Sequence, residues 1–185
     1  GADDNASGVA GVLELARVLK DRPMDRTVRL AFFNLEEVGL IGAREHAAWT
    51  KARVDAGTEK LVGMVSVEMI GYFCDKPGCQ KSPIPPIPGV FTPPDTGDAI
   101  VLVGTQASAP FVRELAAGMR AAEPRIPLFV LDFVPGNAEA MPDLRRSDHA
   151  EFWDIGASAA MLTDTSEFRN PNYHKPTDTI ETLDL

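Results

Sequence analysis

The sequence RLAFFNLEEVGLIG, residues 29–42, predicts the structural step around which the rest of the chain is arranged. The β-branched and aromatic run from Thr27 to Phe33 is typical of a buried strand, and it is followed by the adjacent carboxylates Glu36 and Glu37. The next residues, Val-Gly-Leu-Ile-Gly, indicate a turn into a helix. In open α/β sheets, ligands bind at this carboxyl edge of the strands. Two neighbouring acids there repel each other unless a positive group lies beside them, and a divalent metal ion would meet that need.

The composition limits the classes of function. The chain has 185 residues, of which 44% are hydrophobic and 24% charged, which is ordinary for a globular domain with a sizeable core. The formal net charge is -9 and there is no basic run, so binding to nucleic acid or to an anionic membrane is disfavoured. We expect no membrane span, because no apolar stretch approaches the roughly 20 residues that one requires. The chain opens without Met inside a motif, and we expect a fragment or processed segment of a longer protein.

The two cysteines, Cys74 and Cys79, lie on either side of a Pro-Gly pair. Pro-Gly favours a tight turn, which would bring the two thiols near each other. A local disulfide would fit an exported protein, whereas two free thiols in a loop are the alternative. We therefore expect a secreted or periplasmic protein if the disulfide forms.

The hydrophobic pattern alternates between helix and strand along the whole chain. It predicts a single domain over 1–185, with a three-layer α/β/α fold around a mostly parallel mixed sheet. The Pro-rich stretch at about 72–96 is predicted to be an ordered surface excursion or a lid. The predicted helices cover 7–20, 40–52, 110–123 and a short segment at 147–153 that Ser147 or Asp148 caps, and the predicted strands cover 27–34, 61–67, 99–104, 128–131 and 157–163.

Five polar residues stand beside strand ends or tight turns. They are Asp4, Glu36, Glu37, Glu68 and His174. Carboxylates with an imidazole suit zinc, or manganese or cobalt in its place, if these side chains converge on one rim of the sheet. Each residue also has an ordinary structural interpretation, such as a helix cap for the first acid or a solvated helix start for the Glu-Glu pair. The order of the five residues along the chain favours the metal site.

That order resembles a known family. The chain is similar to the co-catalytic zinc aminopeptidases of the M28 family, which include the bacterial leucyl aminopeptidases. The similarity implies a zinc-exopeptidase-like fold, and it covers nearly the whole chain. It rests on five blocks in the family's order: GADDNASG at 1–8, NLEEVGLIG at 34–42, VEMIGY at 67–72, RSDHAEF at 146–152 and YHKPTDT at 173–179.

The resemblance implies a metal ligand set. It makes Asp4 the carboxylate that bridges two zinc ions, with a cis peptide bond to Asn5. It makes Glu37 and His174 ligands of one zinc ion and Glu68 a ligand of the other. The family often has Asp at the last of these positions, so the longer Glu68 is a departure.

The resemblance also implies the catalytic residues. Glu36 matches the general base, and Tyr173 matches the tyrosine whose hydroxyl stabilises the tetrahedral oxyanion. His149 belongs to a family block but not to the ligand set. We expect it either to shape the wall of the substrate pocket or to pack structurally.

One family ligand is absent from this chain. The family has a further His on a strand upstream of the GADDNASG block, and neither His46 nor His149 stands where it could replace that residue. We therefore expect one zinc ion or none in this chain, in place of the two of a full-length domain. The fold should be N-terminally truncated, and the missing strand should expose a sheet edge through which copies could self-associate.

The predicted function is that of a metal-dependent exopeptidase. The parent protein is expected to be an aminopeptidase that acts on peptide or protein N-termini, with water activated by two zinc ions and with Glu36 as the base. We expect this shortened chain to be inactive. Alternatives are a carboxypeptidase-like or glutaminyl-cyclase-like member of the same scaffold, or a non-catalytic binding module.

Overall fold

A four-stranded mixed sheet forms the centre of the computed structural model, which describes residues 1–184. The strands lie in the order β1–β4–β2–β3. β1 pairs in parallel with β4 and β2 in parallel with β3, whereas β2 and β4 are antiparallel. The sheet is therefore mostly parallel, as the sequence predicts. The strands are β1 (Met64–Glu68), β2 (Ile100–Thr105), β3 (Leu128–Val134) and β4 (Ala159–Thr163).

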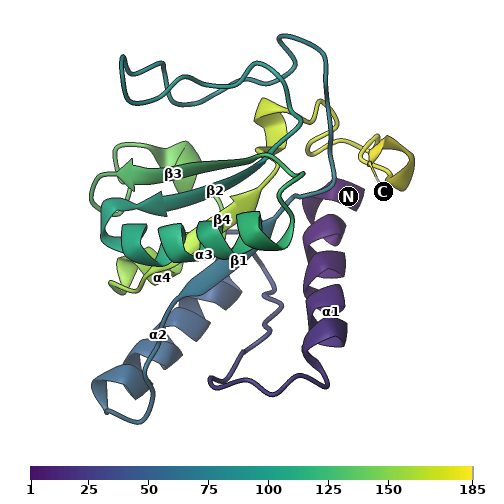
Figure 1. Cartoon of the computed structure of the whole chain (residues 1–185). Coiled ribbons are helices and arrows are strands. Elements are labelled where there is room, and N and C mark those ends of the chain that lie inside the picture. The colour runs from purple at the N-terminus through teal and green to yellow at the C-terminus, as the bar shows by residue number, and fades with distance from the viewer. Residues whose placement is uncertain (185) are drawn as a thin grey trace.

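Helices cover both faces of this sheet, so the three-layer prediction is confirmed (Figure 1). Alternate residues of β2 point to opposite faces. Val101 and Val103 join the core cluster that contains Phe152 of α4 and Ala47 of α2, whereas Leu102 packs in a second cluster with residues of α3. The helices are α1 (Gly8–Leu19), α2 (Ile41–Asp55), α3 (Ala109–Ala122) and α4 (His149–Asp154).

α1 lies close to the chain that leaves β1. A Cβ placed on Gly11 would come 3.0 Å from the Ile70 side chain and 3.9 Å from that of Val67, so the helix approaches this segment as closely as glycine allows. This approach places the segment before α1 beside the carboxyl end of β1.

The predicted strand at 27–34 is wrong. These residues join no ladder, and β1 has its hydrogen-bonded neighbour on one side only, which is β4. A strand needs a partner for its backbone groups, and an apolar run alone does not provide one. Val28 and Phe32 are 45% and 54% exposed, while Phe33 packs against the core. β1 also begins at Met64, later than the predicted 61.

The Pro-rich stretch at 72–96 leaves the sheet after β1 and returns at β2, and it arches over one edge of the sheet in Figure 1. The structure joins Cys74 to Cys79 in a disulfide. Arg169 holds the loop, since its Nε donates to Gln80 Oε1 at 2.8 Å and its Nη2 donates to the Ala99 carbonyl oxygen at 2.7 Å. Arg169 Nη1 also donates to the Tyr72 carbonyl oxygen at 3.3 Å, so one side chain bonds residues at the start, in the interior and just beyond the end of the stretch.

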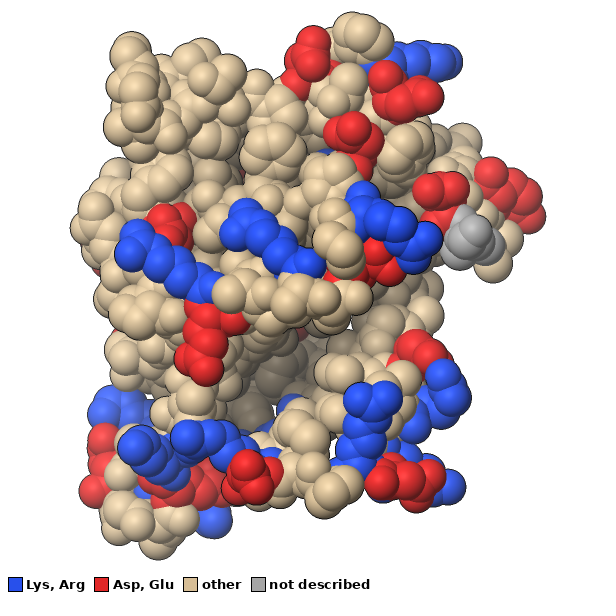
Figure 2. Space-filling view, viewed as in Figure 1, with Lys and Arg blue, Asp and Glu red and all other residues tan. Residues whose placement is uncertain are grey.

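The surface charge is mixed on the face that Figure 2 shows, where blue and red side chains alternate. Residues 82–94 contain no Asp, Glu, Lys or Arg, and this part of the loop contributes to the tan surface at the top. Among the residues that the structure describes, no helix has the length and apolarity that crossing a membrane requires.

Candidate functional site

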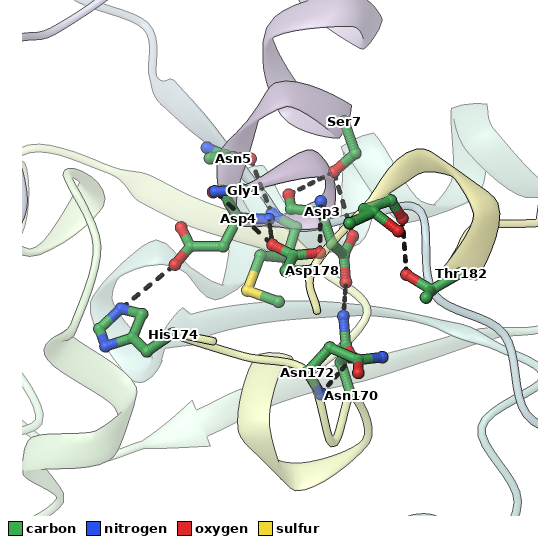
Figure 3. A network of polar contacts seen from close by, with 12 residues as sticks. Gly1, Asp3, Asp4, Asn5, Ser7, Asn170, Asn172, His174, Asp178 and Thr182 are labelled. Carbon is green, nitrogen blue, oxygen red and sulfur yellow. Dashed lines mark hydrogen bonds and ion pairs between the residues drawn. The ribbon is translucent and has the colours of Figure 1, made fainter. Parts of the chain in front are cut away.

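Three side chains with metal-binding atoms meet at one rim of the sheet. One ligand atom from each of Asp4, Glu37 and His174 lies within 4.8 Å of the other two. His174 Nε2 is 3.2 Å from Asp4 Oδ2 and 3.2 Å from Glu37 Oε2. Figure 3 shows His174 directed at the Asp4 carboxylate, on the side of Asp4 that faces away from Asp178. The geometry therefore provides two carboxylates and one imidazole to a single point.

The Asp4 segment is fixed by its neighbour Asn5. The peptide bond between these two residues is cis, in agreement with the resemblance. Asn5 Nδ2 donates to the Val67 carbonyl oxygen at 3.0 Å, and Asn5 Oδ1 accepts from the backbone N–H of Met69 at 3.0 Å. These bonds attach the start of the chain to the carboxyl end of β1.

A tight turn carries Glu36 and Glu37 to the rim. The N–H groups of Gly39 and Leu40 donate to the Glu36 carbonyl oxygen at 3.0 and 2.9 Å. Leu35 and Leu40 have left-handed φ values of 56° and 57°, and the chain reverses between them before α2 begins. The turn follows an extended segment that belongs to no sheet, yet the predicted position of the two acids at the rim is observed.

Glu68 ends β1 beside this cluster but outside it. Its carboxylate accepts a hydrogen bond of 2.7 Å from Ser147 Oγ, which in turn lies 2.9 Å from Ser66 Oγ. Glu68, Glu36 and the three clustered residues all line one cavity. The structure thus brings every predicted site residue to the same cavity, with Glu68 directed toward α4.

Burial raises the pKa of the acids at the rim, and their mutual repulsion adds to this effect. The pKa of Glu36 rises to about 7, first through burial and then through Asp148, Glu37 and Asp4. The pKa of Glu68 rises to about 8 through burial and neighbouring acids, although the Ser147 hydrogen bond opposes the rise. Burial and Glu37 also raise the pKa of Asp4. Carboxylates held together in this way favour a cation.

Tyr173 lies against the same point, stacked on His174 with ring centroids 3.8 Å apart. Its hydroxyl oxygen accepts a hydrogen bond of 2.9 Å from Arg146 Nη2. Arg146 also pairs with Glu167, and its guanidinium lies 5.6 Å from the centre of the Tyr173 ring. Burial raises the pKa of the Tyr173 phenol, and the Arg146 charge lowers it. The hydroxyl is thereby fixed at the cavity wall.

The cavity has a volume of about 370 Å³, and the acids of the rim form part of its lining. Much of the remaining lining is apolar, from strand residues such as Val103 and Leu131 and from Ile84 and Phe91 of the Pro-rich loop, and Lys81 and Arg145 also reach it. A cavity of this kind, in which a few polar groups converge beside an apolar chamber, is typical of a small-ligand site.

Sequence reasoning missed the roles of three residues in the RSDHAEF block. The sequence predicts that Ser147 or Asp148 caps α4, but the Ser147 hydroxyl bonds Glu68, and Asp148 makes no side-chain capping bond. Asp148 has its own pKa raised to about 6, first by burial and then by Glu151, and it is the charged neighbour that most raises the pKa of Glu36. Arg146 holds Tyr173. The block itself was the available signal, since three polar residues directly precede an apolar helix.

His149 packs structurally and does not form the pocket wall. It is fully buried, its Nε2 lies 2.9 Å from the Leu144 carbonyl oxygen, and its ring meets the Trp153 ring edge-on. Burial lowers the pKa of His149 to about 4. The neutral imidazole is therefore part of the core.

The fold and the site together define a class of protein, namely α/β/α proteins with an acidic rim at the carboxyl end of a mostly parallel sheet. The sequence profile of Peptidase family M28 matches residues 1–185. The chain therefore belongs to peptidase family M28.

Individual relatives agree with this assignment. The uncharacterized protein YfbL of Escherichia coli K12 is 36% identical over 183 residues, which cover 99% of this chain and 54% of YfbL. The probable lipoprotein aminopeptidase LpqL of Mycobacterium tuberculosis is 29% identical over 203 residues, covering 100% of this chain and 36% of LpqL. The solved aminopeptidase from Aneurinibacillus sp. strain AM-1 superposes with a TM-score of 0.64 at 25% identity, covering 100% of this chain and 35% of that one. The chain thus spans about half the length of YfbL and about a third of the length of each of the other two proteins.

The buried His149 predicts a pH dependence of stability. Because its pKa falls from 6.5 to about 4 on folding, the unfolded chain binds more protons between these values, and stability is lost as the pH falls through this window. We expect the free energy of unfolding of the wild type, measured with urea, to fall by about 3 kcal/mol relative to that of His149→Gln between pH 6.5 and 4. The buried acids titrate in both proteins, so the difference isolates His149. Parallel pH curves for the two proteins would contradict the buried neutral imidazole.

Proposed function

We propose that this chain carries the catalytic site of a metal-dependent exopeptidase and that the whole protein is an aminopeptidase. The observation that carries the proposal is the convergence of Asp4, Glu37 and His174 at the mouth of an apolar cavity that Glu36 and Tyr173 also line. Relatives named as aminopeptidases, LpqL and the Aneurinibacillus enzyme, support the choice among peptidase activities.

The donor set fits zinc. Two carboxylates and one imidazole suit a borderline cation that accepts both oxygen and nitrogen ligands, and burial and the neighbouring Glu37 raise the pKa of Asp4. Asp4, Glu37 and His174 would hold one zinc ion, and Asp4 with Glu68 would contribute to a second. Bound zinc acts as a Lewis acid and lowers the pKa of coordinated water.

Glu36 would act as the general base. Its carboxyl lines the cavity, and its pKa of about 7 suits a group that takes a proton and returns it near neutral pH. In peptide hydrolysis, it would accept the proton of the attacking water and deliver it to the leaving amine.

Tyr173 would stabilise the negative charge that develops on the scissile carbonyl oxygen. Arg146 occupies a lone pair of the phenol oxygen, and the O–H bond remains free to donate into the cavity. The acidic rim would receive the free α-amino group of the substrate, while the apolar walls accommodate an apolar N-terminal side chain. Peptide N-termini are therefore the proposed substrates.

We also propose that the protein acts outside the cytoplasm. The Cys74–Cys79 disulfide supports this location, because disulfides persist in oxidising compartments. LpqL is described as a lipoprotein, which agrees with it.

The zinc site predicts stabilisation by metal. Zinc at about 100 times its Kd should raise the free energy of unfolding by about 2.7 kcal/mol and raise the Tm accordingly. His174→Ala should abolish this effect, and His46→Ala, outside the cluster, should retain it. In the whole protein, the number of zinc ions per chain, measured by elemental analysis, distinguishes the two-zinc aminopeptidase from the one-zinc cyclase-like alternative. Equal stabilisation of the wild type and His174→Ala would contradict the site.

Glu36→Gln tests the proposed base. In the whole protein, the substitution should lower kcat for an N-terminal apolar amino-acid amide by about 10²- to 10⁴-fold, because the amide side chain cannot accept the proton. Zinc binding should remain, since Glu36 is not in the ligand cluster. Glu45→Gln, on an exposed part of α2, is the matched control and should leave kcat unchanged. Full activity of Glu36→Gln would show that another group moves the proton.

Self-association through the free side of β1 is the proposed interaction between copies. Unpaired strand edges bind further strands, and Val62 and Val65 beside this edge are 49% and 36% exposed. We expect sedimentation to show a mass that increases with concentration. Val65→Lys should suppress the association, and Val90→Lys, in the Pro-rich loop, should not. A monomer at every concentration would contradict the proposal.

A further inference from the structure

The segment that carries Asp4 is held by no regular element. Asp4 and Asn5 have φ and ψ of −96° and 97° and of −126° and 38°, which are not helical, and α1 begins only at Gly8. The buried N–H groups of this segment therefore need acceptors elsewhere in the protein. The position of the Asp4 carboxylate depends on where those acceptors stand.

Asp178 supplies the acceptors. Its Oδ1 accepts from the N–H of Asp3 at 3.0 Å, and its Oδ2 accepts from the N–H of Asp4 at 3.1 Å. Its carbonyl oxygen accepts from the N–H of Ala2 at 3.0 Å. The Asp178 side chain is only 2% exposed, and a Cβ on Gly1 would overlap it. Figure 3 shows this carboxylate directly beside the backbone that carries Asp4.

The same residue belongs to the turn that carries His174. The N–H of Asp178 donates to the Lys175 carbonyl oxygen at 3.0 Å, and the N–H of Lys175 donates to the Asn172 carbonyl oxygen at 2.9 Å. A second bond joins this region to the start of the chain, from Asn170 Nδ2 to Asp3 Oδ2 at 2.7 Å. The imidazole thus stands on a compact turn that is docked onto the Asp3–Asp4 backbone.

We propose that Asp178 is a positioning residue that sets the spacing of Asp4 and His174 and thereby the affinity of the rim for a divalent cation. Asp4 and Asp178 are 174 positions apart in the sequence, so only tertiary contacts fix this spacing. The 3.2 Å separation of His174 Nε2 and Asp4 Oδ2 requires that the two backbone segments remain docked. The inference rests on the proposed metal site.

The carboxylate is suited to this task because both of its oxygens accept hydrogen bonds. In Asp178→Asn, a side chain of the same size directs an NH₂ donor at one of the two backbone N–H groups, and that N–H loses its acceptor. Ser108→Ala is the control, because it also removes the acceptor of a buried backbone N–H group. Ser108 is 1% exposed, its Oγ accepts from the N–H of Ala159 at 3.1 Å, and it bonds neither ligand segment.

The test is the affinity of the metal-free chain for Zn²⁺, measured by calorimetric titration. We expect Asp178→Asn to weaken binding by at least about tenfold, as the loss of a partner that orients a ligand does. Ser108→Ala should stay within about twofold of the wild type, even if both variants lower the Tm. An equal loss in the two variants, or wild-type affinity in Asp178→Asn, would overturn the positioning role.

Hydrogen exchange without metal separates this inference from the proposed function. In Asp178→Asn, the amides of Asp3, Asp4 and the 172–178 turn should exchange faster, and those of α3 should be unchanged. Unchanged exchange at Asp3 and Asp4 would overturn the docking role of Asp178 and would leave the proposed metal site standing. Absence of zinc binding in the wild type would contradict the proposed metal site, and with it the effect on affinity.

Discussion

The crowding of carboxyl groups at one rim of the sheet is the constraint on which the rest of this structure depends. Glu36, Glu68 and Asp148 are largely withdrawn from water, and each of the two glutamates has its pKa raised further by the other acids. Such a cluster persists only where fixed polar partners hold the side chains or a cation neutralises them. Here Ser147 holds Glu68, and Asn5 holds the backbone next to Asp4. Uncharged polar residues next to the acids thus serve to keep the acids together.

Much of the fold could be predicted from local periodicity. α1 and α3 lie where apolar residues recur at helical spacing, β4 lies within its predicted buried run, and β2 is shifted by one residue from the predicted 99–104. The failure at 27–34 has a physical cause, because strand formation depends on a partner that periodicity does not reveal. Residues of this segment make other contacts: Phe33 packs on the core, and the Arg29 guanidinium lies 4.7 Å from the centre of the Trp49 ring of α2.

The site was less accessible to sequence reasoning. The ligand candidates could be located because acids at strand ends and turns follow a recognisable order, and Asp4, Glu37 and His174 do meet. The residues that orient them could not be located, since their partners lie far away in the sequence. Asp178 illustrates the difficulty: read alone, an Asp between two Thr residues is a turn residue, and only the folded chain shows which backbone it accepts from.

Two of the segments that line the cavity, the acidic rim and the Pro-rich loop, contribute different properties. The charged end comes from the rim, whereas Ile84 and Phe91 come from the disulfide-bearing loop, whose residues 82–94 carry no charge. A change of side-chain volume in the loop alters the space offered to a ligand without altering the electrostatic field at the rim. For the proposed peptidase, substrate selectivity and reactivity are thus encoded in different stretches of the sequence. Evolution or design can vary the first in the loop while the second stays constant.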